Sequence, residues 1–324
     1  MSGTGSCSLG KKSKPQKKHH YLPRFYLRGF SPDQCAIFQI YKEESKVIPG
    51  TVDSVGYLKN FHTNDVEGVA DPQFLEKSLA RLEALQSATL KEVYLKGIRA
   101  EETRRDLVDL LALMRMRIPA IKDHVGSSKQ EALRLQMQEL ERKGQLPTRP
   151  TGYEKALAVE NIVIEVSNAE RLRVMFKTAF NKKILKILYQ MRMTLYEAPF
   201  GDSFATSDQP VALYHPDPQL RQQGVGPATI GVQVSFPLTG RLLLQLDNLP
   251  GPHAELLATS DEVHEFNRRT VVMAKKYIFT GDDPVRIAAL TEQYATSSAG
   301  FMHQISTQDG SLYQTHHFIP VSPP

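Results

Sequence analysis

The sequence predicts an α+β protein, in which a helical middle region packs on an antiparallel sheet formed by N-terminal and C-terminal strands. Three observations support this fold class. Strand-like residues cluster near the N-terminus, apolar residues recur at helical spacing over about 71–197, and strand patterns return after Gly201. With 324 residues, 41% of them hydrophobic, the chain can bury a full core. We expect a disordered basic tail at 1–18 and a single domain at 19–324 that carries the helical insert.

The first elements follow from local patterns. Alternating residues at 36–41 and an apolar stretch at 46–48 flank a Lys-Glu-Glu-Ser turn and predict a hairpin. Asp71 as N-cap, with Pro72 after it, opens a helix that runs to Gly97. A second helix is expected over about 101–122, with a kink or an early end at Pro119, because proline cannot donate a backbone hydrogen bond.

The rest of the insert is predicted as further helices. The apolar spacing indicates helices at 127–143, 153–169 and 170–196, and the two prolines within 145–152 indicate a loop. The helix at 170–196 carries a basic face, typical of a solvated surface and also of a helix that crosses a phosphate backbone.

Strand patterns dominate the C-terminal third. They cover 203–213, 228–236 and 241–246, with a turn expected at 237–240. The Thr-Ser-Asp-Glu sequence at 259–262 matches a capping box and opens another helix. A final hairpin is expected over 301–318.

The positive charge is concentrated at one end. Residues 1–30 contain seven Lys and Arg and no acid, whereas the whole chain has a net charge of +5, so the rest is nearly neutral. A lysine-rich tail binds nucleic acid through counterion release, or it only keeps the terminus solvated. Nucleic acid is therefore one expected partner, reached through the tail.

Several protein classes are excluded by what the sequence lacks. No apolar run reaches the ~20 residues of a membrane span, and no signal-peptide core follows Met1, so we expect a cytoplasmic protein. Cys7 and Cys35 are too few for a disulfide framework or a cysteine-rich zinc site. Any divalent metal would therefore need His and carboxylate ligands. No phosphate-binding loop, dinucleotide glycine pattern, His-Glu-x-x-His helix or serine-hydrolase elbow is present.

The densest chemistry lies in the run His-His-Tyr-Leu-Pro-Arg-Phe-Tyr-Leu-Arg-Gly-Phe at 19–30. His19 and His20 offer metal ligands or proton-transfer groups near neutral pH. Arg24 and Arg28 offer forked positive groups for carboxylate or phosphate.

This run resembles the opening signature of domain-of-unknown-function family 4238. The resemblance continues with Phe-His-Thr at 61–63, Leu-Glu at 82–83, Thr-Ser-Asp-Gln-Pro at 206–210, Phe-Pro-Leu at 236–238 and Asn267. His62 stands where the family usually has Tyr, and Gln209 where it usually has Asn. No activity is established for the family, so the resemblance implies a fold frame and candidate positions only.

Further polar residues lie where they need partners. Glu83 is at the edge of a helical apolar stripe, and Arg115 and Arg117 flank the stripe of the next helix. These residues could line a cleft, or one of the arginines could form a structural ion pair with Glu83. Asp208 precedes a proline in a strand, as at a bulge facing a cleft or in an Asx-turn. Asn267 falls inside an apolar helix face, where its amide must be paired.

Two functional hypotheses follow. In the first, the protein is a hydrolase for a phosphodiester or nucleotide, and its polar residues meet in one cleft, where they either hold a divalent metal or act as acid and base. The catalytic candidates are His20, Glu83 and Asp208; the metal candidates are His19, His20 and Asp208; the substrate-binding candidates are Arg24, Arg115 and Asn267. In the second, the protein is a non-catalytic binding protein for nucleic acid or an acidic partner, and the same residues form a structural network.

Overall fold

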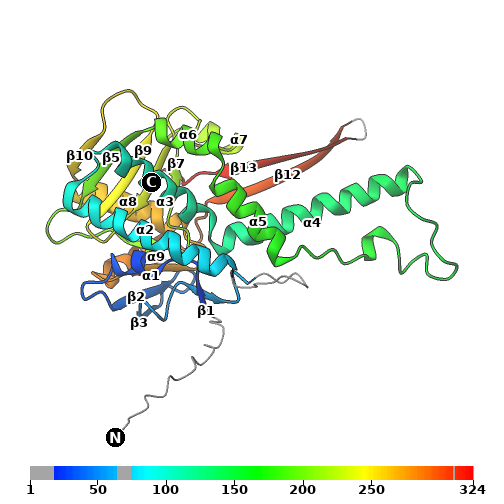
Figure 1. Cartoon of the computed structure of the whole chain (residues 1–324), viewed down its shortest axis with the longest axis horizontal. Helices are drawn as coiled ribbons and strands as arrows, with labels where there is room; N and C mark the ends of the chain where they lie inside the picture. Colours follow the sequence, from blue (N-terminus) through cyan, green and yellow to red (C-terminus); the bar gives the residue numbers. More distant parts are fainter. Residues whose placement is uncertain (1–17, 64–73, 309–310, 324) are drawn as a thin grey trace, which may run out of the picture.

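The computed structural model describes residues 18–63, 74–308 and 311–323 (Figure 1). The predicted tail at 1–18, apart from Lys18, and the predicted N-cap Asp71 lie outside these residues. The described part is a mixed α+β structure with antiparallel strand pairs from the N-terminal and C-terminal regions, as the sequence predicts, but its strands form several sheets and not one. None of its helices is long and apolar enough to cross a membrane.

One sheet joins strands from both ends of the chain. Its order is β3-β2-β11-β6, and every pairing is antiparallel. The strands are β2 (Ala36–Tyr41), β3 (Val47–Thr51), β6 (Thr206–Ser207) and β11 (Tyr277–Thr280). The predicted hairpin of β2 and β3 is confirmed, and it pairs with a strand more than two hundred residues later.

A second sheet has the order β10-β5-β9-β8-β7. Its strands are β5 (Arg192–Glu197), β7 (Ala212–Tyr214), β8 (Gln233–Pro237), β9 (Leu242–Asp247) and β10 (Ala254–Leu257). All pairs are antiparallel except β10 with β5. Strand β9 is buried along its whole length, with Leu242, Leu244 and Leu246 in one hydrophobic cluster and Leu243 in another.

The first two helices of the insert lie where the sequence predicts them. Helix α2 (Phe74–Lys96) is followed by α3 (Glu101–Met116), which ends before Pro119. Proline is tolerated in the first turn of a helix, so the same residue that ends one helix begins α4 (Pro119–Arg142). The expected start of the third helix at residue 127 is therefore too late.

Two predictions for the second half of the insert are wrong. The helix expected at 153–169 is a series of turns and the short 3₁₀ helix η1 (Val159–Asn161), since the β-branched run after it favours extended backbone. The helix expected at 170–196 is two helices and a strand: α5 (Asn168–Ala179), α6 (Lys182–Gln190) and β5. Asn181 separates the helices because its side chain caps α6 by accepting from the amides of Lys183 and Ile184.

The remaining elements complete the body. The expected capping box is present at the start of α8 (Ser260–Met273). Helices α7 (Pro218–Gln223) and α9 (Pro284–Gln293) are shorter. Strands β12 (Gly300–Gln308) and β13 (Ser311–Ile319) form the predicted C-terminal hairpin, which extends from the body beside α4 (Figure 1).

The opening run is built into the core. It contains β1 (Lys18–His20), which pairs with β4 (Tyr57–Lys59), and the short helix α1 (Arg24–Arg28). Tyr26 is fully buried, and its hydroxyl lies 2.7 Å from Thr206 Oγ1 in one sheet and donates over 2.7 Å to the Pro237 carbonyl in the other. This stretch therefore ties the two sheets together.

Candidate metal centre

The pairing of β1 with β4 sends the two adjacent histidines to opposite faces. His19 is opposite Leu58, and His20 is opposite Tyr57. Because successive side chains in a strand alternate, the two imidazoles cannot serve one site from the same face. The strand geometry therefore does not bring His19 and His20 together as ligands of one metal ion, contrary to the prediction from the sequence.

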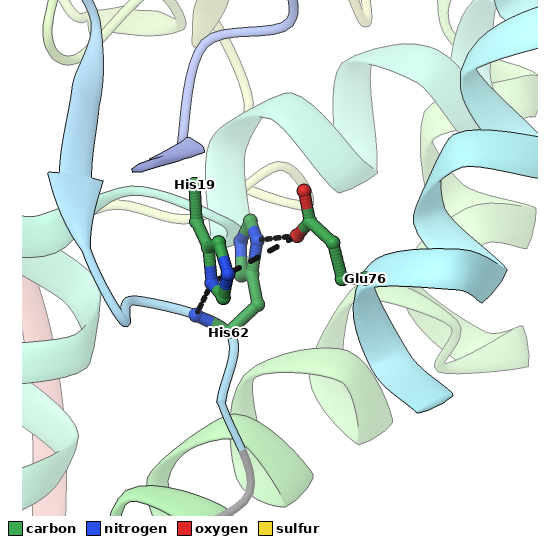
Figure 2. A group of neighbouring side chains, drawn as sticks. All are labelled: His19, His62 and Glu76. Carbon is green, nitrogen blue, oxygen red and sulfur yellow. Dashed lines mark hydrogen bonds and ion pairs between the residues drawn. The ribbon is translucent and has the colours of Figure 1, made fainter. Parts of the chain in front are cut away.

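His19 instead meets two residues from other segments, His62 and Glu76 (Figure 2). His62 follows β4, and Glu76 lies in the first turn of α2. His62 Nδ1 is 2.7 Å from Glu76 Oε2, and His19 Nδ1 is 4.0 Å from the same oxygen. The imidazole rings of His19 and His62 are stacked, with centroids 5.6 Å apart.

One ligand atom from each of these three residues lies within 4.8 Å of the others, which makes the group a candidate metal centre. Both histidine side chains are almost inaccessible, at 1% and 0% exposure, whereas Glu76 is 30% exposed. The Nε2 atom of His62 is buried and has no hydrogen-bond partner in the part of the chain that the structure describes. Two imidazoles and one carboxylate are a ligand set that zinc and related ions accept.

The protonation states suit this role. Burial lowers the pKa of His62 to about 4, despite the opposing effect of its hydrogen bond to Glu76, so its imidazole is neutral at pH 7. Burial also acts to raise the pKa of Glu76, but the hydrogen bond with His62 and nearby positive charge, including Arg117, bring it below its usual value. A neutral imidazole and an ionised carboxylate are the forms that bind a cation.

A bound ion would require a small rearrangement. Metal–ligand bonds of about 2.0–2.2 Å hold the atoms of one tetrahedral site roughly 3.3 Å apart. The 2.7 Å separation of His62 Nδ1 and Glu76 Oε2 is a hydrogen-bond distance, so binding of an ion through Nδ1 would require the carboxylate to move back by less than an ångström. His19 Nδ1 also accepts from the His62 amide over 2.9 Å and would have to release it. Glu76 is the partly exposed member of the group and is free to make such a shift.

Two cations lie next to this centre. Lys122 Nζ donates over 2.8 Å to the carbonyl of Phe61, the residue before His62, and lies 4.2 Å from the centre of the Phe61 ring. Arg117 is close enough to Glu76 and His62 to affect the pKa values of both. Positive charge beside a metal favours an anionic substrate.

His20 and Glu83 are joined by the same Arg117. This side chain is buried, and it donates over 2.8 Å to Glu83 Oε1 and over 2.7 Å to the carbonyl of His20. The ion pair of Glu83 with an arginine at the end of the next helix is the structural alternative considered above, and Arg117 is the arginine that forms it. The Nε2 of His20 is buried without a hydrogen-bond partner among the described residues. Burial, and then the charge of Arg24, lower the pKa of His20 to about 4.

Asp208 lies in a different network. Its two carboxylate oxygens accept from the amides of Lys275, Lys276 and Tyr277, at 2.8–3.3 Å. Burial nevertheless raises its pKa to about 6. Asp208 therefore links the segment after β6 to the segment after α8. This is closer to the backbone-capping role expected of an Asx-turn than to a carboxylate that faces a cleft.

The three predicted substrate-binding residues also have partners. Asn267 accepts from the Ala205 amide at 2.8 Å and donates to the Ser203 carbonyl at 2.9 Å. The guanidinium of Arg115 lies about 5 Å from the ring centres of Phe301 and Phe318. Arg24 pairs with Asp53 at 2.9 Å, in a partly exposed position.

The predicted meeting of His20, Glu83, Asp208 and Asn267 in one cleft is not found in the described residues. Only His20 and Glu83 are brought together, through Arg117. Asp208 and Asn267 are each satisfied by nearby backbone groups, so they need no shared cleft. The predicted metal set of His19, His20 and Asp208 is likewise replaced, since His19 groups with His62 and Glu76.

Sequence reasoning missed His62 and Glu76 as partners of His19. His62 was noted only as an unusual residue within the resemblance. Glu76 lies seven residues before Glu83, which is about two helical turns, so both carboxylates are on the same face of α2. That spacing was the available signal, but it could not show which carboxylate reaches the histidines.

The comparisons with known proteins agree with the opening run and the Thr-Ser-Asp-Gln-Pro segment. The family model described as "Protein of unknown function (DUF4238)" matches residues 18–284. The chain belongs to the DUF4238 family. The DUF4238 match contains β1, His62, Glu76 and Asp208, and hence every residue of the candidate centre. Neither the curated proteins nor the solved structures give a match to this chain.

Proposed function

We propose that this DUF4238 protein is a metal-assisted hydrolase for a phosphodiester or nucleotide substrate, with a divalent cation held by His19, His62 and Glu76. The observation that carries the proposal is the convergence of three ligand atoms from β1, the segment after β4 and α2 within 4.8 Å. Such a three-ligand set leaves coordination positions for water and substrate, as in catalytic zinc sites.

The chain's own residues supply the rest of the chemistry. The cation would lower the pKa of a bound water and polarise a phosphoryl oxygen. Lys122 and Arg117 place positive charge beside the centre, where a phosphodiester carries its negative charge. Cytoplasmic localisation and contact of the N-terminal tail with nucleic acid belong to the same proposal, since both fit such a substrate.

The test is metal binding and turnover by the full chain. We expect one Zn²⁺ or Mn²⁺ per chain by elemental analysis, and metal-dependent cleavage of bis(p-nitrophenyl) phosphate. His62→Ala should weaken metal affinity at least tenfold and abolish cleavage. His264→Ala, which removes an exposed imidazole on α8, is the matched control and should behave as the wild type. Equal metal affinity of wild type and His62→Ala would overturn the proposal.

A second candidate function is non-catalytic binding of nucleic acid or an acidic partner. It is favoured by the backbone partners of Asp208 and Asn267, which account for these residues without catalysis. The same experiment separates the two functions. Metal binding without cleavage of any phosphodiester substrate would support the binding protein, with the metal serving to hold β1 against α2.

A further inference from the structure

A cleft of about 790 Å³ opens beside β4, where Tyr57 and Leu58 line it. Its walls come from the turn before β4, the first turns of α4, the segment between α8 and β11, and the start of β12. Its volume is within the range of small-molecule sites, roughly 300–1,000 Å³. The residues of the candidate metal centre do not line it.

Two deeply buried side chains line this cleft and lack hydrogen-bond partners. Gln209 is 5% exposed and Tyr21 is 3% exposed. Within the described part of the chain, neither the Gln209 side-chain amide nor the Tyr21 hydroxyl makes a hydrogen bond. Neither group is among the fully buried polar atoms that lack a partner, so both are accessible from the cleft and can pair with a ligand there.

The neighbours of Gln209 show why its side-chain amide remains available to a ligand. Ser207 Oγ bonds the backbone of Gln209, donating to its carbonyl at 2.9 Å and accepting from its amide N–H at 3.2 Å. Asp208 is bound by the amides of 275–277. The backbone on both sides of the side chain is therefore fixed, and the side-chain amide is held at the cleft without using its own donor and acceptor.

The rest of the lining indicates the chemistry of the ligand. Aromatic rings are contributed by Tyr21, Tyr57, Tyr277 and Phe301, and the exposed Lys275 and Lys276 stand at the edge. Aromatic rings stack on nucleobases and lysines pair with phosphate. A glutamine amide offers an adjacent donor and acceptor, which matches the edge of a base.

We propose that this cleft binds the base of a nucleotide, with Gln209 bonding the base edge, the tyrosine rings packing on its face and Lys275 and Lys276 meeting the phosphate. The inference rests on the proposed function, because it names the part of a nucleotide or nucleic-acid substrate that the protein recognises. It does not require the metal centre, since the two sites share no residue.

The experiment measures nucleotide binding by the full chain without turnover. Calorimetric titrations with AMP, CMP, GMP and UMP, in EDTA, should give saturable binding for at least one base. Gln209→Ala should weaken that binding about tenfold, the usual loss for one good base contact. Gln209→Asn keeps the amide one carbon shorter and should fall between the two. Gln145→Ala, at an exposed glutamine, is the control and should bind as the wild type.

A second variant tests the proposal even if substitution of the buried Gln209 impairs folding. Replacing the exposed Lys275 and Lys276 by alanine should weaken the monophosphate several-fold and leave the matching nucleoside unchanged. A single-stranded tetranucleotide of the preferred base distinguishes a nucleic-acid ligand from a free nucleotide. It should bind more tightly than the mononucleotide if the ligand is a nucleic acid, and no more tightly if the ligand is a free nucleotide. No binding of any base, or equal binding by wild type and Gln209→Ala, would overturn the proposal.

These outcomes are separate from those of the proposed function. Nucleotide binding in EDTA without cleavage of any phosphodiester would support the nucleotide-binding cleft and contradict the proposed hydrolase activity. Metal-dependent cleavage of bis(p-nitrophenyl) phosphate without nucleotide binding would keep the hydrolase and reject the cleft.

Discussion

Two buried polar regions of this molecule differ in how their hydrogen bonds are completed. Around Asp208, the backbone completes them: the carboxylate accepts from three amides, and the neighbouring Lys42 ammonium donates to the carbonyls of Val272, Ala274 and Ser297. Around β1, atoms of His20, His62 and Arg117 are buried without partners in the described residues. The first pattern is typical of a structural network, and the second is where a ligand can add bonds.

The largest expected effect on stability comes from removing the Asp208 carboxylate, which tests whether the first region is structural. Asp208→Ala leaves three partly buried backbone amides without this acceptor, and a fully buried unpaired group costs roughly 1–3 kcal/mol. We expect the free energy of unfolding, measured with urea at pH 7, to fall by about 3 kcal/mol. Asp106→Ala, at an exposed position on α3, is the control and should change it by less than ~0.5 kcal/mol. A small loss for Asp208→Ala would mean that this network is not structural.

The pH dependence of stability tests the same carboxylate by a smaller effect. Burial raises the pKa of Asp208 to about 6, from 3.8. Between these values the folded state holds more protons than the unfolded state, so the stability contributed by this group falls as pH rises from about 4 to 6. The expected decrease is about 2–3 kcal/mol, since one pKa unit corresponds to 1.36 kcal/mol.

The measurement compares urea unfolding of wild type and Asp208→Asn at pH 4, 5, 6 and 7. Asparagine does not titrate, so the difference between the two proteins should change over this range and then level off. A difference that stays constant from pH 4 to 7 would show that Asp208 keeps an ordinary pKa in the folded protein.

The fold was predictable where one local signal was sufficient. The capping box of Thr259 and Glu262 and the hairpin before residue 51 depend on neighbouring residues, and both are confirmed. The segment 170–196 was not predictable in this way, because its apolar spacing continues through Asn181 into β5. Whether residues 192–197 form helix or strand depends on pairing with β9 and β10, which lie some fifty residues later.

The candidate site shows the same limit. The sequence identified His19 as a metal ligand candidate, and the structure places it in the candidate centre. It could not exclude His20, because that depends on which face of β1 is turned toward α2. It also could not choose Glu76 over Glu83, since both are on the same face of one helix. Asn267 was correctly predicted to be buried and paired, and the partners that the structure shows are backbone groups of Ser203 and Ala205.

The smallest expected effect concerns Arg24, whose charge acts on His20 in the second region. Its ion pair with Asp53 is partly exposed, at 43% and 64% of the two side chains, and such pairs contribute about 0.5 kcal/mol or less. Arg24→Ala should therefore leave the urea midpoint almost unchanged.

Arg24 is also one of the charges that lower the pKa of His20, so its removal should raise that pKa, which can be measured by NMR titration of the imidazole. If stability fell as much as in Asp208→Ala, Arg24 would be part of the structural network. If stability held while the KM for bis(p-nitrophenyl) phosphate rose and kcat did not change, Arg24 would bind the anion, as the sequence predicts.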